Sequence, residues 1–434
     1  MKTTATSIRQ QLEADVNLGV RSPGDRLPSV RTLASELEVS PNTVAAAYKQ
    51  LRDRGVVVGR GRQGTIVAPL SRPTLSQLAS VPEGAIDALR GSPDPSLLPD
   101  LGPAFVAATK SPQVGYGDPL LDEGFAQASR EMFEADKIDG TNLVVTSGAM
   151  DAIEKILIAN DLRPGDRVGV EDPGHIPVHQ LIRSAGLELV PLAIDEAGVL
   201  PDALDLALAK NLAALIVTPR AQNPTGAAFT KQRAEDLSQI LSEHPDLLLI
   251  QDDHAGAISG VDWHDLVPPG TRHATIRSLG KSLGPDLRIS VSVGDAKTID
   301  RVAMAVSNGP GWVSHVLQRA AAHLLTDKAT VKLVAQAAAS YAERRRRLID
   351  ALSKFGVAAS GPSGINVWIP TADEQATVEA ARTAGFAIRA ADAYRVESAA
   401  AVRVTVSNLT TDQIDDLAQA IGAGTSTRVH SPAM

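Results

Sequence analysis

Cysteine is absent from this 434-residue chain, which excludes disulfides, thiolate catalysis and cysteine-based metal sites. Aromatic residues are scarce, at 3% of the sequence, so each one carries more information than usual. Long apolar runs are also missing. No stretch could span a bilayer, and the first nine residues contain no apolar signal-peptide core. We therefore expect a cytoplasmic protein without a membrane segment.

Acidic residues outnumber basic ones, but the imbalance is uneven along the chain. The net charge is −8. Residues 1–67 contain ten Lys/Arg against six Asp/Glu, a balance of +4, so the rest of the chain carries −12. A basic N-terminal segment on an otherwise acidic chain is typical of a segment that binds the phosphate groups of a nucleic acid. The chain is also too long for one core and should divide into two or three domains.

Turn and cap residues in the first 67 positions predict two short helices and a hairpin. Ser29 is placed as the N-cap of one helix, and Ser40 as the N-cap of the next, with Pro41 at its first position. Two short helices with a tight break form a helix-turn-helix. The run 56–67, with a basic glycine-rich middle, predicts a two-stranded wing.

This pattern resembles the winged helix-turn-helix of GntR-type bacterial regulators. The matching segments are 23–31, 39–44 and 61–65. Some relatives carry arginine at the positions of Pro41 and Ala45, so we expect this helix to make fewer base contacts. Each polar residue of the module could instead be a helix cap or a solvated side chain. The residues that the resemblance implies in DNA binding are Arg31, Ser40, Asn42, Thr43, Arg60 and Arg62.

Downstream, the sequence predicts a linker, an α/β body and a tail. Residues 68–83 are rich in proline and serine and lack periodicity, which indicates a linker. Residues 423–434 are expected to form a flexible tail. Residues 84–422 alternate amphipathic stretches with short apolar runs, which predicts a mostly parallel sheet with ligands at the strands' C-terminal ends. The runs are 143–145, 167–170, 214–217, 247–250, 274–276 and 289–293.

The most informative segment of the body is 278–288. It places the amine of Lys281 between the hydroxyl of Ser278 and the guanidinium of Arg288. A pyridoxal phosphate protein needs this set, because a lysine takes the aldehyde while neutral and cationic donors take the phosphate. Residues 147–149 open a predicted helix, whose N-terminal amides suit a phosphate. A cofactor site and a DNA-binding module in one chain suggest a ligand-sensing regulator.

These segments together resemble the fold type I aminotransferases, over residues 84–422. The resemblance implies a mostly parallel sheet and a smaller α+β subdomain. A GntR-like head on such a body is the pattern of MocR-type regulators, and the chain resembles one from end to end. The matching motifs, in the family's order, are 91–95, 116–119, 147–149, 171–174, 223–226, 252–253, 278–281, Arg288, 364–368 and Arg403.

The resemblance implies a role for each of these residues. Lys281 forms an imine with pyridoxal 5′-phosphate, and Asp252 keeps the pyridine nitrogen protonated, with the adjacent Asp253 as an alternative. Asn223 donates to the phenolic oxygen, and Arg403 pairs with the carboxylate of an amino compound. The phosphate-binding set is Ser147, Gly148, Ala149, Ser278, Arg288 and, from the neighbouring subunit of a homodimer, Tyr116.

Two histidines depart from the family pattern. His254 stands where many relatives have a tyrosine that donates to the phenolic oxygen. His175 stands where they have an aromatic residue, often tyrosine, stacked on the cofactor ring. Histidine can donate and stack, but its charge changes near neutral pH, so we expect cofactor binding and less efficient transamination. Neither histidine has metal-ligand spacing, and no metal site is expected.

Three functions remain open. The first is a homodimeric transcription regulator that binds paired or repeated half-sites on double-stranded DNA. Its body would sense pyridoxal phosphate, a small amino-group effector, or both. The second is a working aminotransferase that carries a DNA-binding head. The third is a regulator whose body is a cofactor-free dimerisation scaffold.

Overall fold

The chain divides into two compact units between residues 80 and 81, called the head and the body below. The predicted wing residues Arg60 and Arg62 lie outside the described residues, as do 68–80 of the expected linker and 427–434 of the expected tail. The structure is a computed structural model that describes residues 4–17, 21, 24–53, 56–59, 64–67 and 81–426.

The head has the predicted caps and hairpin. Ser29 accepts a hydrogen bond from the amide of Thr32, and Ser40 accepts one from the amide of Thr43, which confirms both caps. Tyr48 is buried at the centre of the helices, and its hydroxyl donates to a backbone carbonyl at 2.8 Å. Strands β1 and β2 pair antiparallel, and α1 adds a helix that the sequence did not predict. The elements are α1 (Ala5–Asn17), α2 (Val30–Glu36), α3 (Pro41–Asp53), β1 (Val57–Gly59) and β2 (Thr65–Val67).

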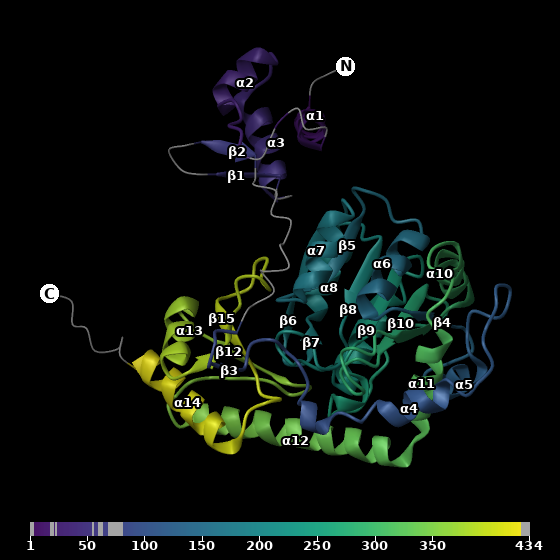
Figure 1. Ribbon diagram of the computed structural model, residues 1–434. Helices are drawn as coiled ribbons and strands as arrows, with labels where there is room; N and C mark the ends of the chain where they lie inside the picture. The colour runs from purple at the N-terminus through teal and green to yellow at the C-terminus, as the bar shows by residue number, and fades with distance from the viewer. Residues whose placement is uncertain are drawn as a thin grey trace. The chain divides into compact units, whose positions relative to one another are not determined.

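The body is built on a sheet that, in the described part of the chain, has eight strands in the order β4-β11-β10-β9-β8-β5-β6-β7 (Figure 1). Strands β10, β9, β8, β5 and β6 run parallel, whereas β11 and β7 are antiparallel to their neighbours. The predicted α/β class is confirmed. The strands are β4 (Leu143–Thr146), β5 (Arg167–Asp172), β6 (Glu188–Asp195), β7 (Gly198–Val199), β8 (Ala214–Val217), β9 (Leu248–Asp253), β10 (His273–Ser278) and β11 (Ser290–Gly294).

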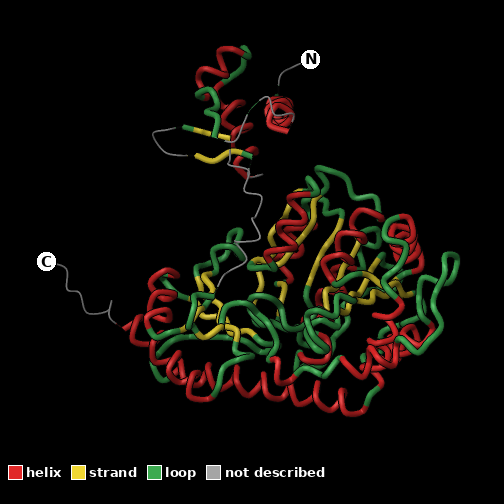
Figure 2. The backbone as a smooth tube through the Cα atoms, viewed as in Figure 1, coloured by secondary structure: helices red, strands yellow, loops and turns green. Residues whose placement is uncertain are grey.

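Helices cover both faces of this sheet (Figure 2). Ile216 of β8 packs in an apolar cluster with α6, α7 and α10, while its neighbour Leu215 packs in a second cluster with α8 and α9. Because successive side chains point to opposite faces, a strand buried on both sides, such as β8, is mostly an apolar run. The helices are α6 (Ala149–Ala159), α7 (Ile176–Ser184), α8 (Pro201–Leu208), α9 (Lys231–Leu241) and α10 (Ala296–Asn308).

A smaller α+β subdomain packs beside the sheet, as predicted. Its three-stranded sheet has the order β12-β15-β14, and β13 pairs with β3 from the start of the body. Helix α12 packs against both α11 and α14 (Figure 1), and α14 continues to Ser426, into the range expected to be tail. Its elements are β3 (Ile86–Asp87), α12 (Lys328–Ser353), β12 (Asn366–Pro370), α13 (Glu374–Thr383), β13 (Phe386–Ala387), β14 (Arg389–Ala390), β15 (Ala401–Thr405) and α14 (Thr411–Ser426). Helices α4 (Gly102–Ala108), α5 (Glu123–Glu134) and α11 (His315–Thr326) instead pack in one apolar cluster with β4 and β11 of the large sheet.

Four charged side chains form a buried ionic cluster at the end of β9. Asp253 accepts two hydrogen bonds from Arg220, both of 2.9 Å, and one of 2.7 Å from Arg277. Asp136 accepts one from each arginine, at 2.9 and 2.7 Å. Burial alone raises the pKa of Asp253, but the charges and hydrogen bonds of Arg277 and Arg220 outweigh it and hold that pKa below its usual range.

Removing one member of this cluster should destabilise the body strongly. Asp253→Asn leaves two buried guanidinium groups with a single carboxylate, and we expect the free energy of unfolding to fall by about 3–5 kcal/mol. Urea unfolding followed by tryptophan fluorescence measures this in the body, because all three tryptophans lie there.

The matched control is Asp415→Asn, which removes an ion pair to Arg347 whose side chains are 50% and 40% exposed. That change should cost less than about 1 kcal/mol. Equal losses in the two variants would contradict a structural role for the buried cluster.

Candidate functional site

The predicted cofactor residues converge at the C-terminal ends of the parallel strands. The sheet order places β4, β11, β10 and β9 side by side, and the predicted residues follow or end these strands and the neighbouring β8 and β5. They are Ser147, Gly148 and Ala149 after β4, Arg288 before β11, Ser278 ending β10, Asp252 and His254 at the end of β9, Asn223 after β8, and His175 after β5.

Lys281 faces a cavity of about 110 Å³. Its Nζ donates to the carbonyl of Gly91. Burial, reinforced by the nearby charge of Arg403, lowers the Lys281 pKa from its usual 10.5 to about 8. A substantial fraction of this amine is therefore unprotonated and nucleophilic near neutral pH. The polar side chains that line the cavity are Arg90, His175, Asn223, His254, Lys281 and Asn366.

The two adjacent aspartates have different environments. Both oxygens of Asp253 are engaged by arginines in the buried ionic cluster. Asp252 is 4% exposed, and its Oδ1 has no hydrogen-bond partner among the described residues. Its Oδ2 lies 3.6 Å from Nδ1 of His254. A buried carboxylate oxygen without a donor is costly, so Asp252 is the aspartate available to a protonated ligand atom.

Arg288 lies directly over the start of α6. Gly148 has a φ of +101°, and a Cβ there would lie 2.7 Å from Nη2 of Arg288, so only glycine fits. The sheet register sets Ser278 opposite Ser290, which is bonded through its hydroxyl to Thr146 at 2.8 Å. The first amides of a helix have no partners within it. A guanidinium, a hydroxyl and the first amides of α6 thus lie at the same edge of the sheet, and these are the donors that a phosphate requires. The amide of Ser147 is already engaged, because it donates to Oδ2 of Asp151 at 2.8 Å.

The two histidines lie face to face across the cavity. The rings of His175 and His254 are nearly parallel, at 17°, with centroids 6.3 Å apart. Burial, followed by the charges of His254, Lys281 and Arg403, lowers the His175 pKa to about 3. The expectation of a charge change near neutral pH is therefore wrong for His175. A buried ring beside cations stays neutral, which keeps it suited to stacking on an aromatic ligand.

Arg403 is hydrogen-bonded to Asn223, which lines the cavity. Arg403 is 3% exposed, and its Nη1 donates to Oδ1 of Asn223 at 3.0 Å. Its Nη2 donates to the carbonyl of Leu89, and its Nε is buried without a partner in the described structure. Its guanidinium also lies 5.2 Å from the ring centre of Tyr394. Because Asn223 accepts through its oxygen, its NH₂ group is left to donate elsewhere.

Asp172 clamps the loop that carries Tyr394. Its carboxylate accepts hydrogen bonds of 2.8, 2.6 and 2.9 Å from the amides of Val396, Glu397 and Ser398. No local sequence pattern indicates this role. The nearest signal was the position of Asp172 in the segment 171–174, but its partners lie more than 220 residues further along the chain.

Tyr116 lies apart from these residues. Its side chain is 98% exposed and contacts the edge of Trp312 at 5.7 Å between ring centres. It does not line the cavity of its own chain. An exposed tyrosine is free to reach a second subunit, and this role stays a prediction.

The predicted DNA-binding residues of the head are mostly exposed. Arg31 on α2 and Asn42 on the first turn of α3 are exposed, and Thr43 is half-buried. The hydroxyls of Ser40 and Thr43 are 2.8 Å apart and are engaged in the cap. Arg31 and Asn42 are therefore the better placed of these four to contact DNA.

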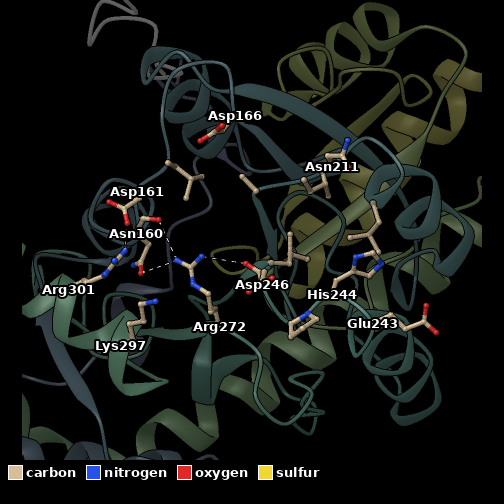
Figure 3. Close-up of a pocket in the computed structure, with 16 residues that line it drawn as sticks. Asn160, Asp161, Asp166, Asn211, Glu243, His244, Asp246, Arg272, Lys297 and Arg301 are labelled. Carbon is tan, nitrogen blue, oxygen red and sulfur yellow. Dashed lines mark hydrogen bonds and ion pairs between the residues drawn. The ribbon is translucent and has the colours of Figure 1, made fainter.

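A larger cavity of about 540 Å³ lies at the opposite, amino ends of the strands (Figure 3). Arg272 at its centre donates to Asn160 and to the carbonyl of Asp246, at 3.4 Å each. None of the predicted site residues lines it, so volume alone does not select the site. Among the described residues, no cluster of His, Asp and Glu could hold a metal ion, and no helix is long and apolar enough to cross a membrane.

Comparisons with known proteins agree with this division into head and body. Residues 4–67 match the family of bacterial regulatory proteins of the gntR type, and residues 91–421 match aminotransferase class I and II. The kynurenine aminotransferase of Pyrococcus horikoshii has the same fold, with a TM-score of 0.72 and 20% identity over 81% of this chain and 93% of that one.

Two similar proteins are named as regulators. The vitamin B6 salvage pathway transcriptional repressor PtsJ of Salmonella typhimurium is 37% identical over 96% of this chain and 97% of its own length. The pyridoxine biosynthesis transcriptional regulator PdxR of Corynebacterium glutamicum is 31% identical over 57% of this chain and 56% of its own length. The chain therefore belongs to the MocR-type transcriptional regulators, in which a GntR helix-turn-helix is fused to an aminotransferase class I and II domain.

Proposed function

We propose that this regulator binds pyridoxal 5′-phosphate covalently at Lys281 and that its DNA binding responds to the cofactor, to a small amino compound, or to both. The observation that carries the proposal is the unpartnered Oδ1 of Asp252 at the end of β9, at the same edge of the sheet as Lys281 after β10, whose pKa is lowered to about 8. The carboxylate of Asp252 is suited to a protonated ring nitrogen, and the amine of Lys281 is suited to an aldehyde. The names of PtsJ and PdxR, which both refer to vitamin B6, support the same ligand.

The residues present fit the cofactor part by part. Arg288, Ser278 and the amides at the start of α6 would hold the phosphate in the space that Gly148 leaves open. His175 would stack on the ring and the NH₂ of Asn223 would donate to its phenolic oxygen. When bound, the cofactor supplies an aldehyde carbon and an electron-withdrawing ring. The carboxylate of Asp252 would hold a proton on the ring nitrogen.

An incoming amine would compete with Lys281 for the same carbon, and Arg403 would receive a carboxylate on that amine. Such a ligand alters DNA binding only if it has different affinities for two conformations of the regulator. A homodimer that presents two heads would bind paired half-sites. Steady multiple turnovers of amino acid and keto acid would instead favour a working aminotransferase.

Borohydride trapping tests the covalent bond. Reduction of the cofactor-loaded protein should fix one cofactor per chain on Lys281, as located by mass spectrometry of the digest. Lys281→Ala should contain no adduct, and Lys231→Ala, which removes an exposed lysine paired with Glu235 on α9, should be labelled like the wild type. An adduct on another residue, or no adduct, would instead favour a regulator whose body is a cofactor-free dimerisation scaffold.

The rate of cofactor uptake should depend on pH in a defined direction. Because the Lys281 pKa is lowered to about 8, the fraction of reactive neutral amine rises with pH and levels off above that value. We expect uptake by the cofactor-free protein to be half-maximal near pH 8. A rate that keeps rising to pH 10, as for an ordinary lysine of pKa 10.5, would show that the amine is not desolvated.

DNA binding should depend on salt and on the head. On the intergenic DNA upstream of its own gene, Arg31→Ala should weaken binding and reduce the slope of log K against log salt by about one per head. Lys110→Ala, an exposed change in the body, should leave the slope unaltered. A footprint that is the same with and without pyridoxal phosphate, and with added amines, would contradict the sensing function.

A further inference from the structure

The smaller cavity is electropositive although it lies in the acidic part of the chain. Arg90 and Lys281 are cationic, and Arg403 lies close enough to lower the Lys281 pKa. The other polar side chains on the wall are neutral amides or imidazoles, and none of the described residues that line it is acidic. A cavity with this lining favours anionic ligands.

The backbone around Arg90 is held in place on both sides. The carbonyl of Leu89 accepts from Arg403, and the carbonyl of Gly91 accepts from Lys281. Asp87 binds the amides of Leu89 and Arg90 through Oδ1, at 3.0 Å each. Arg90 is thus fixed at the cavity wall between the two other cations.

The guanidinium of Arg90 has little to bind within the chain. In the described part of the chain its Nη1 lies 3.8 Å from Oδ2 of Asp87, which is beyond hydrogen-bonding distance. The side chain is 55% exposed, and a pair of this kind contributes little. Its planar donors therefore remain available to a carboxylate or a phosphate.

Cofactor binding does not use this group. The phosphate set lies at Arg288 and the start of α6, and Lys281 would be consumed in the covalent bond. Arg403 and Arg90 are then the two cations left for the effector. Crowding of positive charge is already visible at His175, whose pKa is lowered to about 3 by burial and by four basic neighbours, which include Lys281 and Arg403.

We propose that the effector is an amino acid with two anionic groups, the first held by Arg403 and the second by Arg90. This inference rests on the proposed function, because the ligand's amine must meet the cofactor at Lys281. The second group is a carboxylate or a phosphate, since a guanidinium binds both in the same bidentate way.

The test is a titration of the cofactor-loaded full-length protein, followed by the cofactor's absorbance. L-Aspartate and L-glutamate carry a second carboxylate, O-phospho-L-serine carries a phosphate, and L-alanine carries neither. We expect the wild type to bind the best dianionic amino acid roughly tenfold more tightly than alanine. In Arg90→Gln this ratio should fall to about one, and Arg90→Lys should retain part of it.

The control is Arg382→Gln, which removes an exposed arginine paired with Glu379 on α13 and should keep the wild-type ratio. A preference for aspartate or glutamate identifies the second group as a carboxylate, and one for phosphoserine identifies a phosphate. A wild type without preference, or Arg90→Gln with the full preference, overturns this inference while amine sensing stands. If no amine changes the absorbance although Lys281 is trapped by borohydride, amine sensing and this inference both fail.

Discussion

The ion cluster of Asp253, Arg220, Arg277 and Asp136 is the constraint on which the site depends. Two buried arginines require carboxylate partners. The buried Asp253 bonds to both arginines from the last position of β9, and the partly exposed Asp136 also bonds to both. Because strand neighbours point to opposite faces, the preceding Asp252 must then point away from this cluster. A structural ion cluster on one side of a strand end thereby leaves, on the other side, a carboxylate with one unpartnered oxygen among the described residues.

A second constraint joins the smaller subdomain to the sheet. Arg403 on β15 bonds at once to Asn223, which follows β8, and to the segment 89–91, which follows β3. Three segments that are far apart in sequence therefore share one guanidinium. A carboxylate that binds this group must compete with those contacts, so a ligand here would redistribute bonds across the subdomain boundary. Conformational response and ligand recognition would then use the same side chain.

The fold class and the site residues that are neighbours in sequence could be predicted from local patterns. Contacts between residues far apart in the sequence could not. Segment 278–288 was informative because its donors are neighbours in sequence. By contrast, the choice between Asp252 and Asp253 depends on Arg220 and Asp136, which no local pattern connects to them. Strand β6 was missed because Pro191 interrupts it and one face is partly exposed, so it lacks a continuous apolar run. The proposed role of Arg90 in effector binding could not be predicted from the sequence, because it depends on Arg90 lining the same cavity as Lys281.

The clamp at Asp172 has a thermodynamic consequence for any ligand. Loop residues 396–398 donate three amides to one carboxylate before anything binds, so their conformational entropy is already lost in folding. Binding next to Tyr394 therefore incurs no further ordering cost for this loop. Affinity should follow the charge and shape of the ligand, as for a rigid receptor with preorganised walls, and the loop would act as a fixed support in place of a closing lid.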